Sequence, residues 1–313
     1  MKAVRIHVYG GLDALRYEQA PAPEPGPGEV LLRVHAAGVN PADAKIREGK
    51  AFASMCKEPF PLILGWDVSG VVVAVGAGVE AFGPGDALYG MVNFPCYGGA
   101  YAEYVVAPAS HFSRKPESLD HIHASALPLA ALTAWQALFE AARLSGGERV
   151  LIHAAAGGVG HLAVQLARWK GAAHIIGTAS CDDGEYLKGI GVDELIDYRT
   201  QRFEEIAADV DIVLDCVGGE VQERSWRVLK RGGILVTIME PPPQGKADEH
   251  GVRAGRVFVR PDGAQLGEIA AIADSGRLTP FIYRVFPLEK AREAHELVEK
   301  GQTRGKIVLS VAS

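Results

Sequence analysis

The stretch Arg149–Gly160, RVLIHAAAGGVG, decides the fold of this chain. Val150–Ile152 is a short apolar run of the kind that forms a buried parallel strand. The small residues of Ala154–Gly158 then let the backbone turn tightly, and apolar residues recur at helical spacing over Val159–Trp169. Because the free N–H groups of a helix's first turn point at the preceding loop, this geometry favours a bound pyrophosphate.

The glycines of the turn have the spacing of a dinucleotide-binding loop. Gly157, Gly158 and Gly160 supply a glycine pair and a third glycine, and Ala155 stands where the first glycine is usual. A second strand pattern, His174–Thr178, begins about 20 residues further on. The order strand, loop, helix and strand predicts nucleotide binding, and a plain tight turn is the alternative.

Length and charge narrow the class of protein. A chain of 313 residues is too long for one ordinary core and predicts two domains. The net charge of −6 and the scattered Lys and Arg residues leave no basic face for nucleic acid. A small molecule is therefore the expected partner.

The ends and the cysteines give few further signals. Met1–Gly10 has charges within a strand pattern, unlike a signal peptide, and no uninterrupted apolar run approaches about 18 residues. We expect no membrane association and a cytoplasmic protein. The four cysteines, Cys56, Cys96, Cys181 and Cys216, are far apart, which predicts free thiols and neither a disulfide framework nor a zinc ribbon.

The first part of the chain predicts a β-rich domain with Gly and Pro punctuation. Its strand patterns are Lys2–Val8, Glu29–Ala37, Val68–Val75, Asp86–Met91 and Tyr101–Val106. The C-terminal tail predicts a helix over Gly263–Asp274, a helix over Leu288–Lys300 and a last strand over Lys306–Val311. Since that strand needs a sheet to join, residues 1–124 and 262–313 are predicted to form one domain, with 125–261 inserted.

The inserted region alternates strands and helices after a buried helix predicted over Ala124–Leu144. This alternation is typical of a doubly wound parallel sheet. Further strands are predicted at Glu194–Ile196, Asp211–Leu214, Gly233–Ile238 and Val257–Val259, and further helices at Gly184–Ile190, Phe203–Ala208 and Gln222–Leu229. The polar, proline-rich run Met239–Gly255 predicts a loop over the site, or a surface loop without function.

Two short segments of the β-rich region contain candidate site residues. Asn40 and Pro41 open a short helix, so Asn40 is either a helix cap or a functional amide. For Asp43, the structural alternatives to a functional role are a helix cap and a local ion pair. The loop Met91–Tyr97 either lines a pocket or covers the core.

Taken together, the blocks GVNPAD, GWDVSGVVVAVG, LTAWQAL, HAAAGGVG, GTAS, LIDY, DIVLDCVGG, VLKRGG and RGKIVL run from residue 38 to residue 309. In this order and spacing the chain resembles the medium-chain dehydrogenase/reductase superfamily, in its zinc-independent quinone oxidoreductase branch. The resemblance implies an α/β protein with a GroES-like β-rich catalytic domain and a Rossmann domain. It also implies that the nicotinamide lies between them.

The resemblance also bears on metal. Zinc alcohol dehydrogenases of the superfamily have cysteine, histidine, glutamate and cysteine where this chain has Asn40, Trp66, Asp67 and about Leu129. One remaining carboxylate cannot make the three-ligand open site that catalytic zinc needs. The four-cysteine structural lobe is missing as well. We therefore predict no metal ligand.

The cofactor positions follow from the same resemblance. Asn40 and Thr133 correspond to residues near the nicotinamide, and Ala156, Gly157, Gly158, Val159 and Gly160 to the pyrophosphate loop. No Asp or Glu ends the strand at Thr178–Ser180 to hold a ribose hydroxyl, so NADPH is favoured over NADH. Ser180, Tyr198 and Arg199 correspond to contacts of the 2′-phosphate, although Asp182 and Asp183 lie nearby and repel a phosphate if they point inward.

These observations predict NADP(H)-dependent hydride transfer to a quinone or an activated enone, without metal. Asn40 is the expected donor to the developing oxyanion, and water, Tyr97 or Lys45 supplies the proton. The alternatives are an alcohol or aldehyde dehydrogenase of the zinc type and a non-catalytic NADPH-binding protein. A strand at Arg256–Val259 at the sheet edge would pair with a second copy to give a homodimer.

Overall fold

The structure is a computed structural model that describes residues 1–55, 60–301 and 303–311. The chain divides into two compact units. Unit 1 comprises Met1–Leu132 and Arg260–Ser313, and unit 2 comprises Thr133–Val259. The chain therefore passes from unit 1 to unit 2 between residues 132 and 133 and returns between residues 259 and 260. The predicted domain boundaries are 124/125 and 261/262.

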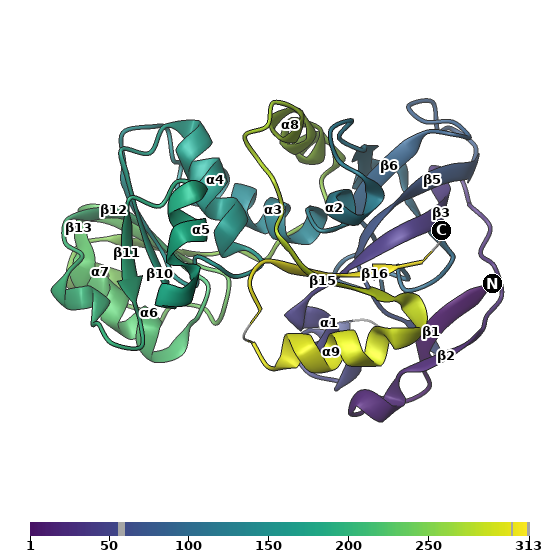
Figure 1. Ribbon diagram of the computed structural model, residues 1–313, viewed down its shortest axis with the longest axis horizontal. Helices are drawn as coiled ribbons and strands as arrows, with labels where there is room; N and C mark the ends of the chain where they lie inside the picture. Colours follow the sequence, from purple (N-terminus) through teal and green to yellow (C-terminus); the bar gives the residue numbers. More distant parts are fainter. Residues whose placement is uncertain (56–59, 302, 312–313) are drawn as a thin grey trace. The chain divides into compact units, whose positions relative to one another are not determined.

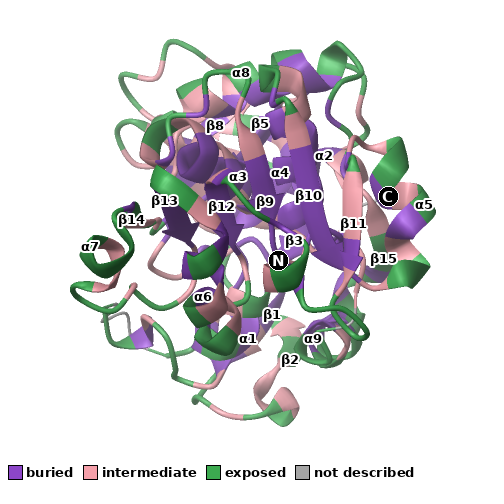
Figure 2. Ribbon diagram, turned by 90° about the vertical axis from the view of Figure 1, so that its left-hand side faces the viewer, coloured by how far each residue is buried: buried purple, intermediate pink, exposed green. Residues whose placement is uncertain are grey.

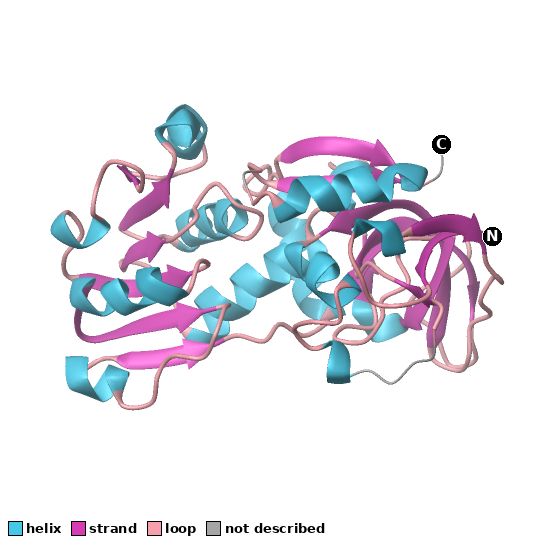
Figure 3. Ribbon diagram, turned by 90° about the horizontal axis from the view of Figure 1, so that it is seen from below, coloured by secondary structure: helices cyan, strands magenta, loops and turns pink. Residues whose placement is uncertain are grey.

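Unit 1 is built mainly of strands (Figures 1 and 3). Its strands are β1 Lys2–Ile6, β2 Arg16–Gln19, β3 Glu29–Val39, β4 Leu62–Ile63, β5 Asp67–Val75, β6 Ala87–Met91, β7 Tyr104–Pro108, β8 Phe112–Arg114, β15 Ile282–Pro287 and β16 Lys306–Ser310. They form a small sheet ordered β2-β1-β4 and a larger one ordered β15-β16-β3-β5-β6-β8, with β7 also paired to β3. The last strand thus completes the first domain's sheet, as the sequence predicted.

The helices of unit 1 are α1 Pro41–Arg47, α2 His121–Ser125, α8 Gly263–Asp274 and α9 Ala291–Glu299. Helix α8 has the bounds that its apolar spacing predicted, because Asp262 caps it by accepting a hydrogen bond from the Gln265 N–H at 3.0 Å. Helix α3, Pro128–Trp135, spans the point where the chain passes from unit 1 to unit 2.

Unit 2 is a parallel sheet with helices packed against it (Figure 1). Its strands are β9 Arg149–Ile152, β10 His174–Ala179, β11 Glu194–Asp197, β12 Val210–Asp215, β13 Leu229–Thr237 and β14 Arg253–Arg256, and its helices are α4 Gly160–Lys170, α5 Gly184–Gly189, α6 Gly219–Ser225 and α7 Lys246–His250. The spatial order β11-β10-β9-β12-β13-β14 is that of a Rossmann fold, so the predicted fold class is confirmed. The central strands β9, β10 and β12 are buried, whereas the edge strand β11 is half-exposed (Figure 2).

Several predicted elements are wrong. The single helix predicted over Ala124–Leu144 is broken at Pro128, whose ring cannot continue the preceding helix, and it ends in a π-helical turn at Gln136–Ala141. Of the helix predicted over Phe203–Ala208, only Phe203–Glu205 is helical, as a short 3-10 turn. The edge strand is β14, whose polar and exposed residues carry no apolar strand pattern, and not Val257–Val259. Strand β14 and helix α7 both lie where a loop was predicted.

Two further features of the described chain concern thiols and membranes. Cys181 and Cys216 are free as predicted, but the prediction is wrong for Cys96, which is disulfide-bonded; Cys56 lies outside the described residues. None of the helices in the described part of the chain combines the length and apolar character that crossing a bilayer requires.

Candidate active site

A buried polar cluster in unit 1 joins Asn40, Asp67 and Lys306. Their exposed fractions are 3%, 0% and 3%. Asn40 Nδ2 donates to Asp67 Oδ2 at 2.9 Å, and Lys306 Nζ donates to Asn40 Oδ1 and, at 3.3 Å, to Asp67 Oδ2. The second carboxylate oxygen, Asp67 Oδ1, accepts the backbone N–H of Leu129 at 2.6 Å. Every oxygen of Asp67 therefore has a donor, and its charge is balanced by the Lys306 ammonium.

Sheet register brings these residues together. Strand β3 pairs antiparallel with β5 so that Gly38 faces Asp67, and with β16 so that Val39 faces Ile307. The next residues, Asn40 and Lys306, consequently lie side by side although 266 residues separate them. A Cβ on Gly38 would lie 2.8 Å from the Asp67 Cβ, so only glycine permits this close approach.

The cluster fixes which way the Asn40 amide points. A lysine ammonium has three donors and no acceptor, so the Asn40 oxygen must face Lys306 and its nitrogen must face Asp67. Asn40 also occupies the N-cap position of α1, where its backbone N–H donates to Asp43 Oδ2 at 2.7 Å. The capping role that the sequence left open for Asp43 is thus present, and the Asn40 side chain takes part in the buried cluster.

Asp43 is an unusual acid. It is fully buried beside the equally buried Tyr101, whose hydroxyl interacts with its carboxyl group. Burial is the largest cause that raises the pKa of Asp43, to about 7. The hydrogen bond from the Asn40 N–H lowers this pKa, and the neighbouring Asp67 carboxylate raises it. The carboxyl is therefore substantially protonated near neutral pH.

The other two predicted catalytic residues lie elsewhere in unit 1. Lys45 is on the exposed face of α1, opposite the buried Ala44 and Ile46. Tyr97 is half-buried, and its hydroxyl lies 2.5 Å from that of Tyr9. The contact between Tyr9 and Tyr97 includes no residue of the Asn40 cluster.

In unit 2, the loop after β9 lies where the strand order reverses. β9 has β10 on one side and β12 on the other, and open α/β sheets bind ligands at the carboxyl ends of the strands at such a point. The buried His153 anchors this loop, because its ring nitrogens lie 3.1 Å from Thr178 Oγ1 and 2.9 Å from Ser225 Oγ. Burial lowers the pKa of His153 to about 4, which keeps the ring uncharged.

The loop has the close packing that a glycine requires. A Cβ on Gly160, the first residue of α4, would lie 2.2 Å from the Ala154 oxygen and 2.8 Å from the Ala155 Cα. Ala154 itself has a φ of 51°, a left-handed conformation that few residues other than glycine adopt. The backbone of 154–160 thus folds into a cradle at the start of α4, which fits a diphosphate.

The remaining predicted cofactor residues are distributed over three elements. Ala156 is buried, while Gly157, Gly158 and Val159 are half-exposed on the loop. Thr133 is a buried residue of α3, with 5% of its surface exposed. Parallel pairing brings the ends of β10 and β11 together, and there Arg199 Nη2 donates to Ser180 Oγ. The neighbouring residue Tyr198 is 66% exposed.

Sequence reasoning missed one residue that the structure places at these sites, Lys306. Lys306 had only the block RGKIVL as a signal, which does not reveal that the side chain is buried against Asn40. Asp182, which the sequence analysis named as a source of repulsion toward a phosphate if it points inward, has its Oδ2 2.9 Å from Arg199 Nη2 in an ion pair.

A Rossmann-type parallel sheet with a glycine-rich turn at the start of α4, together with a β-rich unit, is the architecture of a nucleotide-dependent oxidoreductase. Residues 26–117 match the family model described as alcohol dehydrogenase GroES-like domain, and residues 190–309 match that described as zinc-binding dehydrogenase. The chain is 36% identical over 356 residues to NAD(P)H oxidoreductase RTN4IP1, mitochondrial, from Mus musculus, covering 99% of this chain and 89% of that protein.

Two further comparisons agree. 2-Methylene-furan-3-one reductase from Solanum lycopersicum is 35% identical over 321 residues, covering 99% of this chain and 79% of that protein. The structure of the quinone oxidoreductase from Coxiella burnetii superposes with a TM-score of 0.93 at 38% identity, covering 100% of this chain and 99% of that one. The chain belongs to the medium-chain dehydrogenase/reductase superfamily, in its quinone oxidoreductase-like branch, and is an oxidoreductase.

The zinc in the name of the second family model does not fit this chain. Of the four positions that hold catalytic zinc in related alcohol dehydrogenases, three are occupied by Asn40, Trp66 and Leu129, and both oxygens of Asp67 already accept from protein donors. Within 1–55, 60–301 and 303–311, no group of three or more His, Cys, Asp or Glu side chains is arranged to hold a metal ion.

Proposed function

We propose that this protein reduces a quinone or an activated enone with NADPH and without a catalytic metal. The observation that carries the proposal is the closed cluster of Asn40, Asp67 and Lys306. A lysine ammonium lies against the carboxylate and the amide at the very positions that hold metal ligands in zinc-dependent relatives. The fixed positive charge there belongs to the protein.

The glycine cradle fits the cofactor. Residues Ala156–Gly160 would hold its diphosphate, Thr133 and Asn40 would face its nicotinamide, and Ser180, Tyr198 and Arg199 would hold the 2′-phosphate. When bound, the reduced nicotinamide supplies the hydride. The side chains of this protein supply position and electrostatic stabilisation.

Asn40 is the proposed donor to the oxygen on which charge develops. An amide nitrogen carries two hydrogens, and the contact with Asp67 uses one of them. Lys306 fixes the amide by engaging its oxygen, so the second hydrogen has a defined direction before substrate binds. Lys306 is therefore a positioning residue, and its charge strengthens the amide as a donor.

The source of the proton is proposed from the same unit. Tyr97, whose hydroxyl is paired with that of Tyr9, Lys45 on the exposed face of α1, and water are the candidates. Tyr97→Phe and Lys45→Met separate them, because loss of the true donor lowers the turnover number and abolishes one limb of its pH profile.

The substrate class rests on the relatives. One is named for a quinone, and another is named for a 2-methylene-3-one, which is an enone. Both substrates accept a hydride and leave the negative charge on an oxygen, which is the atom that an amide donor stabilises.

The test measures oxidation of NADPH and of NADH across quinones, enones and aldehydes, together with the metal content of the purified protein. We expect turnover of quinones or enones with NADPH, unaffected by a chelator. Stoichiometric zinc that is lost together with activity would contradict the metal-free mechanism. Tight NADPH binding without turnover of any acceptor would indicate a cofactor-binding protein.

The cellular location and the oligomeric state of this protein are also proposals. We propose a cytoplasmic location, whereas the name of the mouse relative places that protein in mitochondria. We propose a homodimer through the outer edge of β14, the last strand of the unit 2 sheet. Light scattering on the purified chain tests this, and a monomeric mass at micromolar concentration would contradict it.

A further inference from the structure

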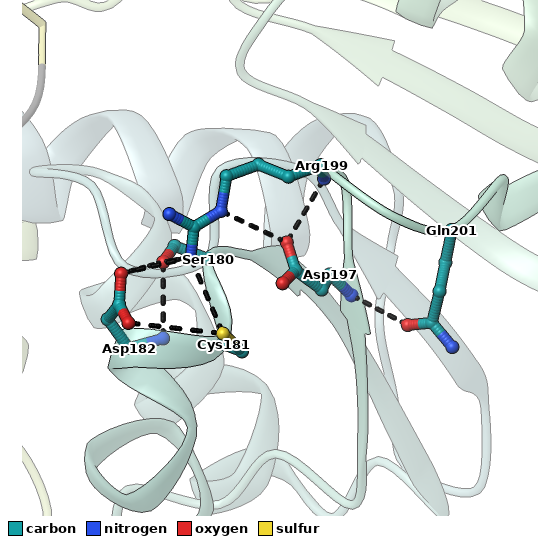
Figure 4. A network of polar contacts seen from close by, with 6 residues as sticks. All are labelled: Ser180, Cys181, Asp182, Asp197, Arg199 and Gln201. Carbon is teal, nitrogen blue, oxygen red and sulfur yellow. Dashed lines mark hydrogen bonds and ion pairs between the residues drawn. The ribbon is translucent and has the colours of Figure 1, made fainter.

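The carboxylate of Asp182 occupies a site made of positive and polar donors (Figure 4). Arg199 Nη2 donates to Asp182 Oδ2 at 2.9 Å, and Ser180 Oγ donates to the same oxygen at 2.8 Å. Arg199 Nη2 also donates to Ser180 Oγ. The oxygen therefore accepts from the two side chains that are proposed above to hold the 2′-phosphate of NADPH.

Arg199 is held from a second side by Asp197, at the end of β11. Asp197 Oδ1 accepts the backbone N–H of Arg199 at 3.0 Å and its Nε at 3.4 Å. The Asp197 side chain is 13% exposed, whereas that of Asp182 is 74% exposed. Asp197 is thus a fixed support for the guanidinium, and Asp182 is a solvated partner that a ligand can displace at small cost.

The Asp182 carboxylate and a 2′-phosphate would compete for the same hydrogen-bond donors, those of Ser180 and Arg199. A guanidinium and a hydroxyl make charge-assisted hydrogen bonds to either a carboxylate or a phosphate. The pKa of Asp182 is lowered by the hydrogen bonds from Ser180 and Arg199, so the carboxylate is ionised at neutral pH. A phosphate that reaches Arg199 must therefore displace a negative charge and then tolerate it nearby.

We propose that Asp182 is a residue that determines cofactor specificity, by placing its carboxylate where the 2′-phosphate of NADPH binds. This rests on the proposed function of Ser180 and Arg199. The carboxylate weakens binding of the phosphorylated cofactor, and it can accept a hydrogen bond from the 2′-hydroxyl of an unphosphorylated one. The protein then discriminates only modestly between NADPH and NADH.

The test measures binding without turnover. Isothermal titration of the full-length protein with 2′,5′-ADP and with 5′-AMP isolates the contribution of the 2′-phosphate. Asp182→Asn removes the charge and keeps the backbone N–H that donates to Ser180 Oγ at 3.1 Å. We expect it to tighten 2′,5′-ADP binding about fivefold or more and to leave 5′-AMP binding unchanged or weaker.

The matched control is Glu185→Gln, which removes the same charge from an exposed residue in the first turn of α5. It should change both dissociation constants less than about twofold. An equal gain in Glu185→Gln and Asp182→Asn would show a general charge effect and overturn the proposal. Unchanged or weaker 2′,5′-ADP binding in Asp182→Asn would overturn it as well.

A third variant separates this inference from the proposed function. Arg199→Ala should remove the preference for 2′,5′-ADP over 5′-AMP. If that preference persists without Arg199, the proposed 2′-phosphate site is wrong, and the role of Asp182 is wrong with it. If Arg199→Ala removes the preference while Asp182→Asn leaves it unchanged, the phosphate site stands and only the competition by Asp182 is wrong.

Discussion

Replacing Lys306 with methionine tests the buried cluster of unit 1 most directly. Methionine keeps the length of the side chain but removes the ammonium, which leaves the Asp67 carboxylate fully buried with two neutral donors, the Leu129 N–H and the Asn40 amide. Breaking a buried ion pair on one side costs about 3–5 kcal/mol, because the remaining charge has no counter-ion. The hydrogen bonds lost at Asn40 and Asp67, at about 1.5–3 kcal/mol each, give a similar total.

We therefore expect Lys306→Met to lower the free energy of unfolding by about 3–5 kcal/mol. Urea unfolding followed by circular dichroism measures the loss. Hydrogen exchange should localise it to β3, β5 and β16 in unit 1, with β9, β10 and β12 of unit 2 as the internal reference. Protein that remains folded should also show a lower turnover number at unchanged NADPH affinity, because Asn40 loses its fixed orientation.

The double variant Lys306→Met, Asp67→Asn provides the control. Since it removes both charges, its destabilisation should be at least about 2 kcal/mol smaller than the sum of the two single variants. A single-variant loss below about 1 kcal/mol, or strict additivity in the double variant, would refute the view that these two charges are buried partners.

Three further predictions follow from the same structure. Asn40→Ala should lower the turnover number tens- to hundredsfold, equivalent to about 2–4 kcal/mol, with NADPH affinity nearly unchanged. Steady-state kinetics and a binding titration measure the two effects. An unchanged turnover number would remove Asn40 from the mechanism. Gly160→Ala should weaken NADPH binding and destabilise the protein by about 1–3 kcal/mol, because its Cβ would overlap the Ala154 oxygen. The control Gly189→Ala, whose Cβ meets nothing within 4 Å, should have neither effect in the same titration and melting curves. The pKa of Asp43 is raised from 3.8 to about 7 in the folded protein, so the folded protein holds a proton that the unfolded chain releases. The contribution of this group to stability is therefore fully present below about pH 4 and is lost as the pH rises toward 7. Asp43→Asn should flatten this part of the dependence of unfolding free energy on pH, measured by urea melts at several pH values, and an unchanged slope would argue against a protonated Asp43.

Local sequence patterns predicted most of the fold because buried strands and amphipathic helices carry their own periodicity. Strands β9 and β10 and helix α8 lie within a residue of their predicted bounds for this reason. The glycine spacing of 157–160 likewise predicted the loop, since a close backbone approach excludes a side chain. Elements without such a pattern were missed: β14 is polar and exposed on a sheet edge, and its pairing with β13 alone makes it a strand.

The sequence by itself determined the alternation of strands and helices around β9 and α4, the glycine cradle and the loss of zinc ligands, because each depends on residue type and short-range spacing. Only the tertiary structure decided that Lys306 contacts Asn40 and Asp67, and that Asp182 forms an ion pair with the Arg199 guanidinium. These contacts depend on strand register and on the ends of neighbouring strands. Register is set by pairing across hundreds of residues, which no local pattern encodes.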